Sequence, residues 1–490
     1  MPTITWRPWS VDAFVQARDE RKPVLLSIVT AWSQSCRDMD QTTYADPEVA
    51  RLVSDMFVAV RVDADRQPDI SERYSLGGWP TTAFLTGEGA IAGGGTFVAR
   101  DRMAAVLQRA AQAFVTKAAD VSRASPETLV EQGAPGGGAA LSEAELVDVV
   151  FGTYDPEFGG FGTAPKFPLT APVQLALDLC REGGDANARQ IAIRSLEAMG
   201  WGPLYDEGDG GFFRCADERT WAGPHREKLL EVNAALIGLY VSASEVLGDE
   251  RYADRAHDAL RYAQNWLADQ VDAGWGNAQH DDREYYDAQA ANFDGRRVRP
   301  QVDRTLFGAA NAAMISAALA AARAFDDKAL GSFAVASLER LLTTCYRPAQ
   351  GVAHYADASG RRGGLLDDHV AVAAASLDAF DSTGNIVYEM MAEELMRHAL
   401  RVMWDDVRGL FFDRSEPVAA EAVGLMRVRL HPFVTNCAAA AVLHRLSASS
   451  GEHDFGVRAA EVLAALAGVA AEQGPQASHY LLAARAARFR

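Results

Sequence analysis

Hydrophobic residues in the first quarter of the chain come in short runs separated by amphipathic stretches. The runs Val24–Val29, Val58–Val62 and Thr81–Leu85 have the length and composition of buried strands. Helical periodicity appears near 11–18, 36–43, 47–56 and 101–117. Ser10 and Asp46 stand at N-cap positions, and Pro47 suits a first helical position. This alternation of strands and helices predicts an α/β domain over residues 1–118.

From Leu141 onward the pattern is helical and rich in alanine and leucine. The predicted helices lie near 142–151, 171–182, 187–200, 228–247, 250–270, 307–324, 327–345, 368–382, 387–403, 433–449, 452–470 and 476–488. A glycine-aromatic element such as Gly159-Gly160-Phe161 or Gly210-Gly211-Phe212 follows alternate helices. Such a repeat predicts helical hairpins. The sequence therefore predicts a six-hairpin (α/α)6 toroid over 141–490, with the inner helices following the glycine-aromatic elements.

Residues 119–140 separate the two predicted domains. They have low hydrophobicity and include the run Pro135-Gly136-Gly137-Gly138. Because such a segment has little apolar surface to bury, we expect a linker here.

Composition narrows the functional class. The chain of 490 residues has a formal charge of −19, which argues against a duplex-binding surface of clustered Lys and Arg. Its five cysteines are scattered, as in a reduced protein without a disulfide framework. The start of the chain shows no basic stretch followed by an apolar one, and the apolar helix near 308–322 is too short to span a bilayer. We expect a cytoplasmic protein with no nucleic-acid or membrane partner.

A potential redox site follows the first predicted strand. Trp32 leads into Ser33-Gln34-Ser35-Cys36 at the start of a predicted helix, where a thioredoxin-type site carries C-x-x-C. The first cysteine of such a pair is the attacking thiolate, and the second resolves the mixed disulfide. Since a serine hydroxyl cannot replace that thiolate, we expect a degenerate redox site without thiol-disulfide oxidoreductase activity. An alternative role for Cys36 is a single redox-sensitive thiol.

Polar residues gather between each glycine-aromatic element and the next inner helix, so we expect them at one pole of the toroid. Carboxylates and a histidine there permit acid–base chemistry on a sugar or polyol. The candidate catalytic residues are His225, Glu227, Asp281, Asp367 and Asp368. The candidate substrate-binding residues are Lys166, Arg214, Asp217, Trp221, His280, Asp303, His369 and Asn436. No nucleotide-binding or metal-ligand motif stands out, so we expect neither a cofactor nor a metal.

Several distinctive motifs resemble one family over nearly the whole chain. They include Gly77-Gly78-Trp79-Pro80, the run Gly159–Pro168, Pro224–Leu229 and Leu366-Asp367-Asp368. The sequence resembles the spermatogenesis-associated thioredoxin-like family, which joins a thioredoxin-like domain to a six-hairpin toroid. The resemblance implies that Pro80 is a cis-proline facing the Ser33–Cys36 turn. The chain departs from the family at Ser33, where a cysteine is typical, and at Arg226 and Glu231.

Two functions from different classes follow from these patterns. In the first, the toroid binds or transforms a carbohydrate-like small molecule, with sugar epimerase, isomerase or glycosidase as candidate activities. In the second, the chain is a thioredoxin-like interaction or chaperone module, with one redox-sensitive cysteine and a structural toroid. A binding protein without catalysis is a third reading. The resemblance of the toroid to sugar enzymes is one of fold and assigns no substrate.

Overall fold

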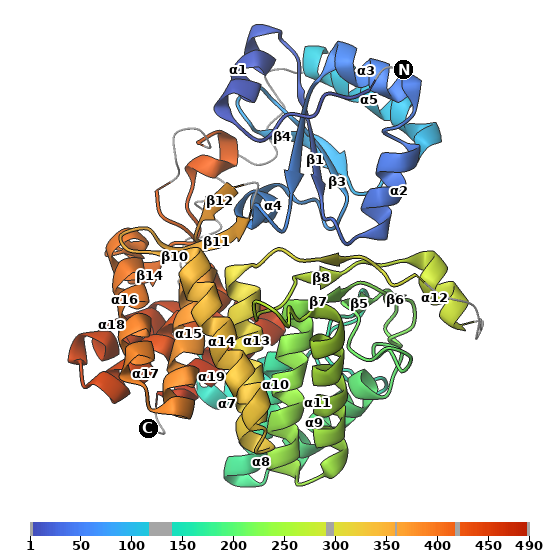
Figure 1. The fold of residues 1–490 in the computed structure, drawn as a ribbon. Helices are drawn as coiled ribbons and strands as arrows, with labels where there is room; N and C mark the ends of the chain where they lie inside the picture. Colours follow the sequence, from blue (N-terminus) through green and yellow to red (C-terminus); the bar gives the residue numbers. More distant parts are fainter. Residues whose placement is uncertain (1–2, 117–139, 291–297, 358–359, 417–421, 488–490) are drawn as a thin grey trace. The chain divides into compact units, whose positions relative to one another are not determined.

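A computed structural model describes residues 3–116, 140–290, 298–357, 360–416 and 422–487 (Figure 1). The chain divides into two compact units. The first comprises Met1–Ala134 and Asp413–Leu430, and the second comprises Pro135–Phe412 and His431–Arg490. The predicted linker 119–140 falls almost wholly outside the described residues.

The first unit is built on a four-stranded sheet in the order β2-β1-β3-β4. Its strands are β1 (Val24–Val29), β2 (Val58–Asp63), β3 (Thr81–Leu85) and β4 (Ile91–Gly95). Its helices are α1 (Val11–Asp19), α2 (Gln34–Thr42), α3 (Pro47–Met56), α4 (Pro68–Tyr74) and α5 (Arg100–Thr116). Strand β1 runs parallel to β2 and antiparallel to β3. This arrangement confirms the predicted thioredoxin-like fold and adds helix α4, which the sequence pattern did not predict.

Alternate residues of the central strand serve two separate hydrophobic cores. Leu26 packs with residues of α1 and α4, whereas Leu25 packs with residues of α2, α3 and α5. Successive side chains of a strand point to opposite faces, so one buried run supplies both cores. This explains why β1 appears in the sequence as a continuous apolar run without alternation.

The segment Asp413–Leu430 belongs to the first unit, although the sequence placed it within the toroid domain. Val423, Leu425 and Met426 join the core that contains Tyr74 of α4. The Tyr74 hydroxyl accepts a hydrogen bond from Leu425 N at 2.8 Å and donates one to Gly89 O at 2.9 Å. Burying such apolar side chains contributes roughly 1.5–3 kcal/mol each. The expected domain 141–490 is therefore interrupted by a segment that completes the thioredoxin-like core.

Buried charges also join this segment to α4. Arg73 is fully buried and pairs with Asp413 at 2.7 Å, and it donates a second bond to Val428 O at 2.7 Å. Removing one partner of such a pair leaves an uncompensated buried charge, which is strongly destabilising. The first unit therefore depends on residues far from it in the sequence.

The second unit is a closed ring of six helical hairpins, as the sequence predicts (Figure 1). The inner helices are α8 (Thr170–Gly183), α10 (Leu230–Leu247), α13 (Gly308–Ala324), α15 (Leu366–Thr383), α17 (Phe433–Ser450) and α19 (Ala477–Ala486). The outer helices are α7 (Glu143–Phe151), α9 (Ala186–Gly200), α11 (Glu250–Tyr262), α14 (Lys328–Cys345), α16 (Ile386–Val402) and α18 (His453–Ala467). Helix α19 contacts α7 and α8, and Arg485 of α19 binds Glu143 and Glu182. Helices α19 and α7 come from opposite ends of the helical unit, and their contact closes the ring.

One helix, α10, has the length and hydropathy of a membrane span. It packs between α8 and α13 in the inner ring. Its apolar composition is therefore explained by burial inside the helical unit.

Short helices and strands connect the hairpins. The helical ones are α12 (Arg283–Ala290), the π-helical turn Ala263–Leu267 and the 3-10 turn Ala470–Gln476; in the first unit a further 3-10 turn spans Gly424–Arg427. The strands are β5 (Cys215–Ala216), β6 (Pro224–His225), β7 (Lys228–Leu229), β8 (Ala278–Gln279), β9 (Val302–Asp303), β10 (Tyr346–Arg347), β11 (Gly351–Asp357), β12 (Gly360–Gly363), β13 (Trp404–Asp405) and β14 (Leu410–Phe411). They form four small sheets, among them β7-β8-β9 and β10-β11-β12.

Four of the glycine-aromatic elements are turns closed by an aspartate. The Asp155 side chain accepts hydrogen bonds from the backbone amides of Glu157 and Phe158, both at 3.1 Å. Asp206, Asp269 and Asp405 bond the amides two and three residues ahead in the same way. Aspartate side chains favour this local bonding, so the repeated sequence produces the repeated turn.

A side chain in the fourth position of an inner helix ties that helix to the preceding turn. Asn436 of α17 accepts from Phe411 N at 2.7 Å and donates to Phe411 O at 2.9 Å. Asn233 of α10 bonds Phe212, and Asn311 of α13 bonds Trp275, with the same geometry. These bonds satisfy backbone groups that the turn would otherwise bury without partners.

In α15 this position is occupied by His369. Its Nε2 accepts from Val352 N at 3.2 Å, and its Nδ1 lies 2.8 Å from Leu365 O. Since a carbonyl oxygen only accepts, Nδ1 carries the proton and the ring is neutral. Burial correspondingly lowers the pKa of His369. Histidine therefore takes the structural place of asparagine in this hairpin.

The first prediction concerns the asparagine ties. Asn436→Ala should lower the free energy of unfolding by roughly 1–3 kcal/mol, because the amide and carbonyl of Phe411 lose their buried partner. Urea denaturation followed by circular dichroism measures the change. Asn187→Ala at an exposed position of α9 is the matched control and should stay within about 0.5 kcal/mol. An equal effect of the two variants would contradict the assigned role of Asn436.

The second prediction concerns acid stability. His369 and His398 stack with ring centroids 5.1 Å apart, and burial lowers the pKa of His398 to about 4. The pKa of an unfolded histidine is about 6.5, so below that pH the unfolded chain binds protons that the buried rings of the folded protein do not bind. The free energy of unfolding should therefore fall as the pH falls from about 6.5 toward about 4.

His369→Asn separates this effect from general acid denaturation. Asparagine restores the tie of the other hairpins but does not titrate, so the variant should lose less stability between pH 7.5 and 5 than the wild type. Denaturation at the two pH values tests this, with His453→Gln at an exposed position as control. A loss as large as that of the wild type would show that His369 is not one of the titrating groups.

Candidate functional site

The Ser33–Cys36 turn lies at the start of α2 in the first unit. Ser33 is the N-cap, and its hydroxyl accepts a hydrogen bond from Cys36 N at 3.4 Å. Both side chains are buried, and burial raises the pKa of the Cys36 thiol. The thiolate is the reactive form of cysteine, so this environment disfavours reactivity at neutral pH.

The other parts of a thioredoxin-like site surround this turn. The Trp79–Pro80 peptide bond is cis, as the family resemblance implied. The rings of Trp32 and Trp79 meet edge to face at 5.6 Å, and Trp32 Nε1 donates to Asp65 at 2.7 Å. The unit thus keeps the aromatic and proline framework around a serine in place of the first cysteine.

In the second unit, four of the predicted residues form one cluster before α10. Arg214 Nε donates to Glu227 Oε1 at 2.5 Å, and its Nη2 lies 3.3 Å from His225 Nδ1. His225 Nε2 in turn lies 2.8 Å from Asp217 Oδ1. Glu227 is buried, whereas His225 and Asp217 are more accessible. We call Asp217, His225, Arg214 and Glu227 the arginine cluster. Its Glu227 is held by a charge-assisted bond.

A second cluster lies at the N-terminal ends of α10 and α15, and we call it the carboxylate cluster. Its members are Glu231, His354, Asp367, Asp368 and Thr435. The Thr435 hydroxyl donates to Asp367 Oδ1, and His354 Nδ1 lies 3.1 Å from both carboxylate oxygens of Asp368. Glu231 interacts electrostatically with Asp367 and His354. The cluster thus gathers three carboxyl groups and a histidine from separate segments.

Two carboxyl groups of this cluster occupy corresponding positions in the repeat. Glu231 is the second residue of α10, and Asp367 is the second residue of α15. Helix α13 packs between α10 and α15, and its second residue is Ala309. The methyl side chain of Ala309 cannot form a hydrogen bond with either carboxylate. Helix N-termini also carry positive partial charge, which favours the anionic forms of both groups.

The carboxyl groups differ in their surroundings. Burial by the surrounding protein is the largest cause that raises the pKa of Glu231, and the charge of Asp367 raises it further, while His354 opposes the shift. Nevertheless, the Glu231 and Asp367 side chains keep exposed surface. Asp368 is fully buried, and its pKa is lowered by His354 and by the hydrogen bond from Leu365 N, against the effect of burial. Glu231 and Asp367 are therefore the carboxyl groups of the cluster that remain accessible to a ligand.

Other predicted residues hold the turns together. Lys166 is buried and donates to Asp155 at 2.7 Å and to Arg219 O at 3.0 Å. Its ammonium lies 5.1 Å from the Trp221 ring centroid, and Trp221 Nε1 donates to Phe158 O at 3.1 Å. Asn436 and His369 bond the backbone as described above. Lys166, Trp221, Asn436 and His369 thus have structural partners for the polar atoms that were expected to bind a substrate.

The predicted residues of the β8–β9 region are more dispersed. His280 N donates to Gln301 O at 2.8 Å, and Asp303 accepts from Thr305 N at 2.9 Å. The charge of Asp281 contributes to the raised pKa of Tyr286, which burial mainly causes. These contacts do not by themselves place His280, Asp281 or Asp303 with either cluster.

Glu231, His354 and Thr435 were not among the predicted site residues. The repeat contains the signal that identifies Glu231 as a counterpart of Asp367. Each lies two positions before the residue that ties its inner helix to a turn, in Leu230-Glu231-Val232-Asn233 and Leu366-Asp367-Asp368-His369. His354 and Thr435 have no such signal, because their roles depend on contacts across the toroid.

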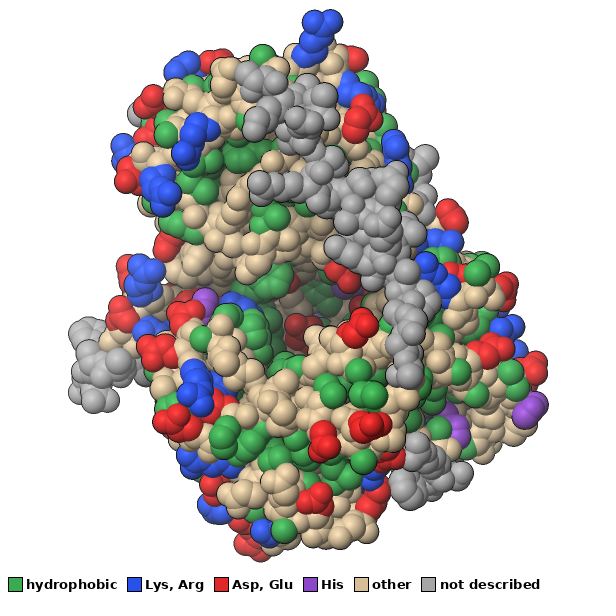
Figure 2. Space-filling model, turned by 180° about the vertical axis from the view of Figure 1, so that it is seen from behind, with side chains coloured by type: hydrophobic (Ala, Val, Ile, Leu, Met, Phe, Trp, Pro, Cys, Tyr) green, Lys and Arg blue, Asp and Glu red, His purple; other side chains and the backbone are tan. Residues whose placement is uncertain are grey.

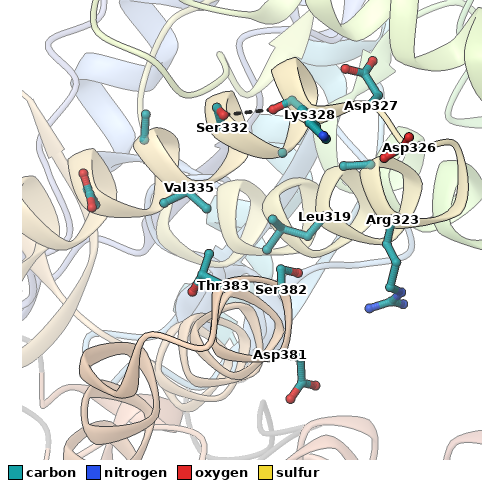
Figure 3. Close-up of a pocket in the computed structure, with 14 residues that line it drawn as sticks. Leu319, Arg323, Asp326, Asp327, Lys328, Ser332, Val335, Asp381, Ser382 and Thr383 are labelled. Atoms are coloured by element: carbon teal, nitrogen blue, oxygen red, sulfur yellow. Dashed lines mark hydrogen bonds between the residues drawn. The ribbon is translucent and has the colours of Figure 1, made fainter.

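A groove of about 790 Å³ lies at the other end of the same helices (Figure 3). It is lined by the end of α13, the start of α14 and the end of α15, including Leu319, Lys328, Val335 and Thr383. Charged side chains of both signs, among them Arg323 and Asp381, also line it. Acidic and basic side chains are likewise interspersed over the face seen in Figure 2. The carboxylate cluster, with its interacting titratable groups, is the better candidate site.

Comparison with known families first identifies the thioredoxin-like unit. The family model described as "Protein of unknown function, DUF255" (Thioredox_DsbH) matches residues 2–133. Thioredoxin-1 of Drosophila yakuba is 31% identical over 71 residues, which are 14% of this chain and 63% of that protein. Both matches agree with the fold of the first unit.

The toroid resembles solved structures of sugar enzymes. A sugar epimerase from a ruminal bacterium superposes with a TM-score of 0.52 at 14% identity, covering 66% of this chain and 86% of that one. A D-mannose isomerase has the same TM-score at 12% identity and covers 66% and 83% of the two chains. At such identities the likeness shows the shared fold.

Longer sequence matches extend beyond the thioredoxin-like unit. Spermatogenesis-associated protein 20 of Mus musculus is 30% identical over 298 residues, which are 54% of this chain and 37% of that protein. The uncharacterized protein B0495.5 of Caenorhabditis elegans is 25% identical over 319 residues, 59% and 41% of the two chains. The chain thus spans about two fifths of the length of these curated relatives. These matches support the resemblance of the chain to the spermatogenesis-associated, thioredoxin-containing proteins.

Proposed function

We propose that the helical unit binds a carbohydrate-like small molecule at the carboxylate cluster and transforms it by acid–base chemistry. The observation that carries this proposal is the pair Glu231 and Asp367, two accessible carboxyl groups from corresponding positions of α10 and α15. Their charges interact, although the helices are separated in the ring by α13. Sugar hydroxyls are good partners for such carboxylates, because each hydroxyl donates one hydrogen bond and accepts others.

Unequal environments give the two carboxyl groups different chemical roles. Burial and the charge of Asp367 raise the pKa of Glu231, which favours its protonated form. Asp367 accepts from Thr435, an interaction that favours the ionised form. A protonated carboxyl group can donate a proton to the substrate, and an ionised one beside it can accept hydrogen bonds from sugar hydroxyls. This supports a reaction in addition to simple binding.

The fold neighbours support the same ligand class. A toroid of this kind occurs in the sugar epimerase and the D-mannose isomerase described above. That likeness is one of architecture, and the choice of substrate for this chain rests on the carboxylate cluster itself. Glu227 of the arginine cluster lies four residues before Glu231 along the chain, and the cluster is a candidate for further hydroxyl contacts through His225 and Asp217.

We further propose that the thioredoxin-like unit performs no dithiol–disulfide exchange. Such exchange passes through a mixed disulfide formed by an exposed thiolate, and here the attacking position is Ser33. The remaining thiol, Cys36, is buried, and its pKa is raised. This unit would then be an accessory to the toroid.

The third prediction tests the carboxylate pair. The protein should bind or convert one member of a panel of reducing sugars, namely D-glucose, D-mannose, N-acetyl-D-glucosamine and cellobiose, monitored by NMR. Glu231→Gln and Asp367→Asn should each lower turnover by roughly 100-fold or more, since the first removes the proton donor and the second removes the charged group that holds the sugar hydroxyls. Both substitutions keep side-chain size, so the melting temperature should change little.

Glu245→Gln provides the control, because Glu245 is exposed on the same helix as Glu231. It should bind and turn over the sugar like the wild type. Saturation-transfer NMR measures binding separately from turnover. If none of the sugars binds or reacts, or if both carboxylate variants behave like Glu245→Gln, the proposed site is wrong.

The fourth prediction tests the redox unit. The wild type should not catalyse reduction of insulin by dithiothreitol, because Ser33 cannot form a mixed disulfide. Ser33→Cys recreates the C-x-x-C spacing and is the positive control for the scaffold. Turnover by the wild type that disappears in Cys36→Ser would show that a single thiol suffices for this chemistry.

A further inference from the structure

His354 has a defined partner on one side of its ring. It lies on β11, with its side chain 12% exposed, and its Nδ1 lies 3.1 Å from both carboxylate oxygens of the fully buried Asp368. Phe307 packs against the ring at a centroid distance of 5.3 Å. The aromatic contact and the Asp368 carboxylate together restrict the orientation of the imidazole.

Asp368 is itself rigidly held. Its Oδ1 accepts from Ala309 N at 3.1 Å, and its Oδ2 accepts from Leu365 N at 3.0 Å. Asp368 therefore links the first turns of α13 and α15 while it bonds His354. Its bonds to the two backbone amides are sufficient to cap these helices. The bond to His354 is therefore an additional interaction of this buried carboxylate.

The bond to Asp368 determines which nitrogen of His354 exchanges protons. A carboxylate accepts hydrogen bonds, so His354 Nδ1 carries a proton and Nε2 is the basic nitrogen of the neutral ring. An imidazole oriented in this way by a buried carboxylate is a recurring form of general base. His354 also interacts electrostatically with Glu231, which places it in the same cluster as the accessible carboxyl groups.

We propose that His354 is a catalytic acid–base residue of this site, that Asp368 is its positioning residue, and that the substrate is a reducing sugar reacting in its open-chain α-hydroxy aldehyde or ketone form. This inference rests on the proposed function and specifies its reaction class. Glycoside hydrolysis generally uses two carboxyl groups as its acid and base. An imidazole base beside a carboxylic acid suits transfer of a proton between neighbouring carbon atoms.

The reaction needs no oxidant or reductant. His354 Nε2 removes the proton from C2 of an aldose, and the electron pair of that C–H bond forms a double bond between C1 and C2. The carbonyl oxygen at C1 takes the proton of the Glu231 carboxyl group, which gives a neutral enediol. His354 then returns its proton to C1 while the hydroxyl at C2 gives its proton to Glu231, and the product is the ketose. Asp367 would bind sugar hydroxyls during these steps.

Exchange with solvent deuterium tests this inference. The protein is incubated in D₂O with D-glucose, D-mannose or cellobiose, and NMR follows the signal of the C2 proton. The wild type should exchange this proton or form the isomer. His354→Gln should lower the rate by roughly 100-fold or more with less than about a threefold change in KM, because the general base is lost. His453→Gln, at an exposed position of α18, should have the wild-type rate.

Asp368→Asn tests the positioning role. Loss of the carboxylate removes the charge that favours protonated His354, so the acidic limb of the pH–rate profile, along which the base loses its proton, should move to lower pH. A purely structural role would lower the melting temperature without moving the profile. A profile that stays in place would therefore overturn the role of Asp368, and a wild-type exchange rate in His354→Gln would overturn that of His354.

The outcomes also separate this inference from the proposed function. The isomerase-type reaction would be overturned if a sugar binds in a way that depends on Glu231 and Asp367 but its C2 proton does not exchange. It would also be overturned if cellobiose releases new reducing ends without C2 exchange. Either result would leave the sugar site in place. Absence of both sugar binding and turnover would overturn the site itself.

Discussion

The toroid depends on one repeated interaction, the pair of hydrogen bonds between an inner-helix side chain and the backbone of the preceding turn. Asn233, Asn311 and Asn436 make both bonds, and His369 makes the one to the turn amide, that of Val352, in its hairpin. Each turn buries an amide and a carbonyl that need partners, and a single side chain four residues into the helix satisfies them. Every glycine-aromatic turn tied in this way is therefore attached to the N-terminal end of an inner helix.

This constraint explains which polar residues are available for chemistry. Lys166 and Lys228 are buried against the turn aspartates, where they satisfy charges that the repeat creates. Glu231 and Asp367 lie on the same helix ends but keep exposed surface and interact with each other. The fold does not require these two side chains, and they lie among other charged groups. Residues of this kind are good candidates for a functional role.

The thioredoxin-like unit differs from the toroid because residues distant in the sequence complete its hydrophobic core. Val423, Leu425 and Met426 supply part of its core, and Asp413 neutralises its buried Arg73. The chain therefore leaves the helical unit and returns to it after residue 430. The chain thus passes from one unit to the other after residues 134, 412 and 430.

The sequence by itself determined strands β1 to β3 and helices α1, α2, α3 and α5 of the first unit, the six hairpins and the serine at position 33. These features are set by residues close together in the chain, through periodicity, capping and turn chemistry. Only the tertiary structure decided that Asn436 and Lys166 are structural, that the charge of Asp367 influences Glu231, and that 413–430 joins the first unit. The physical reason is that a polar side chain is buried, paired or accessible according to segments distant in sequence, and a local pattern carries no information about those partners.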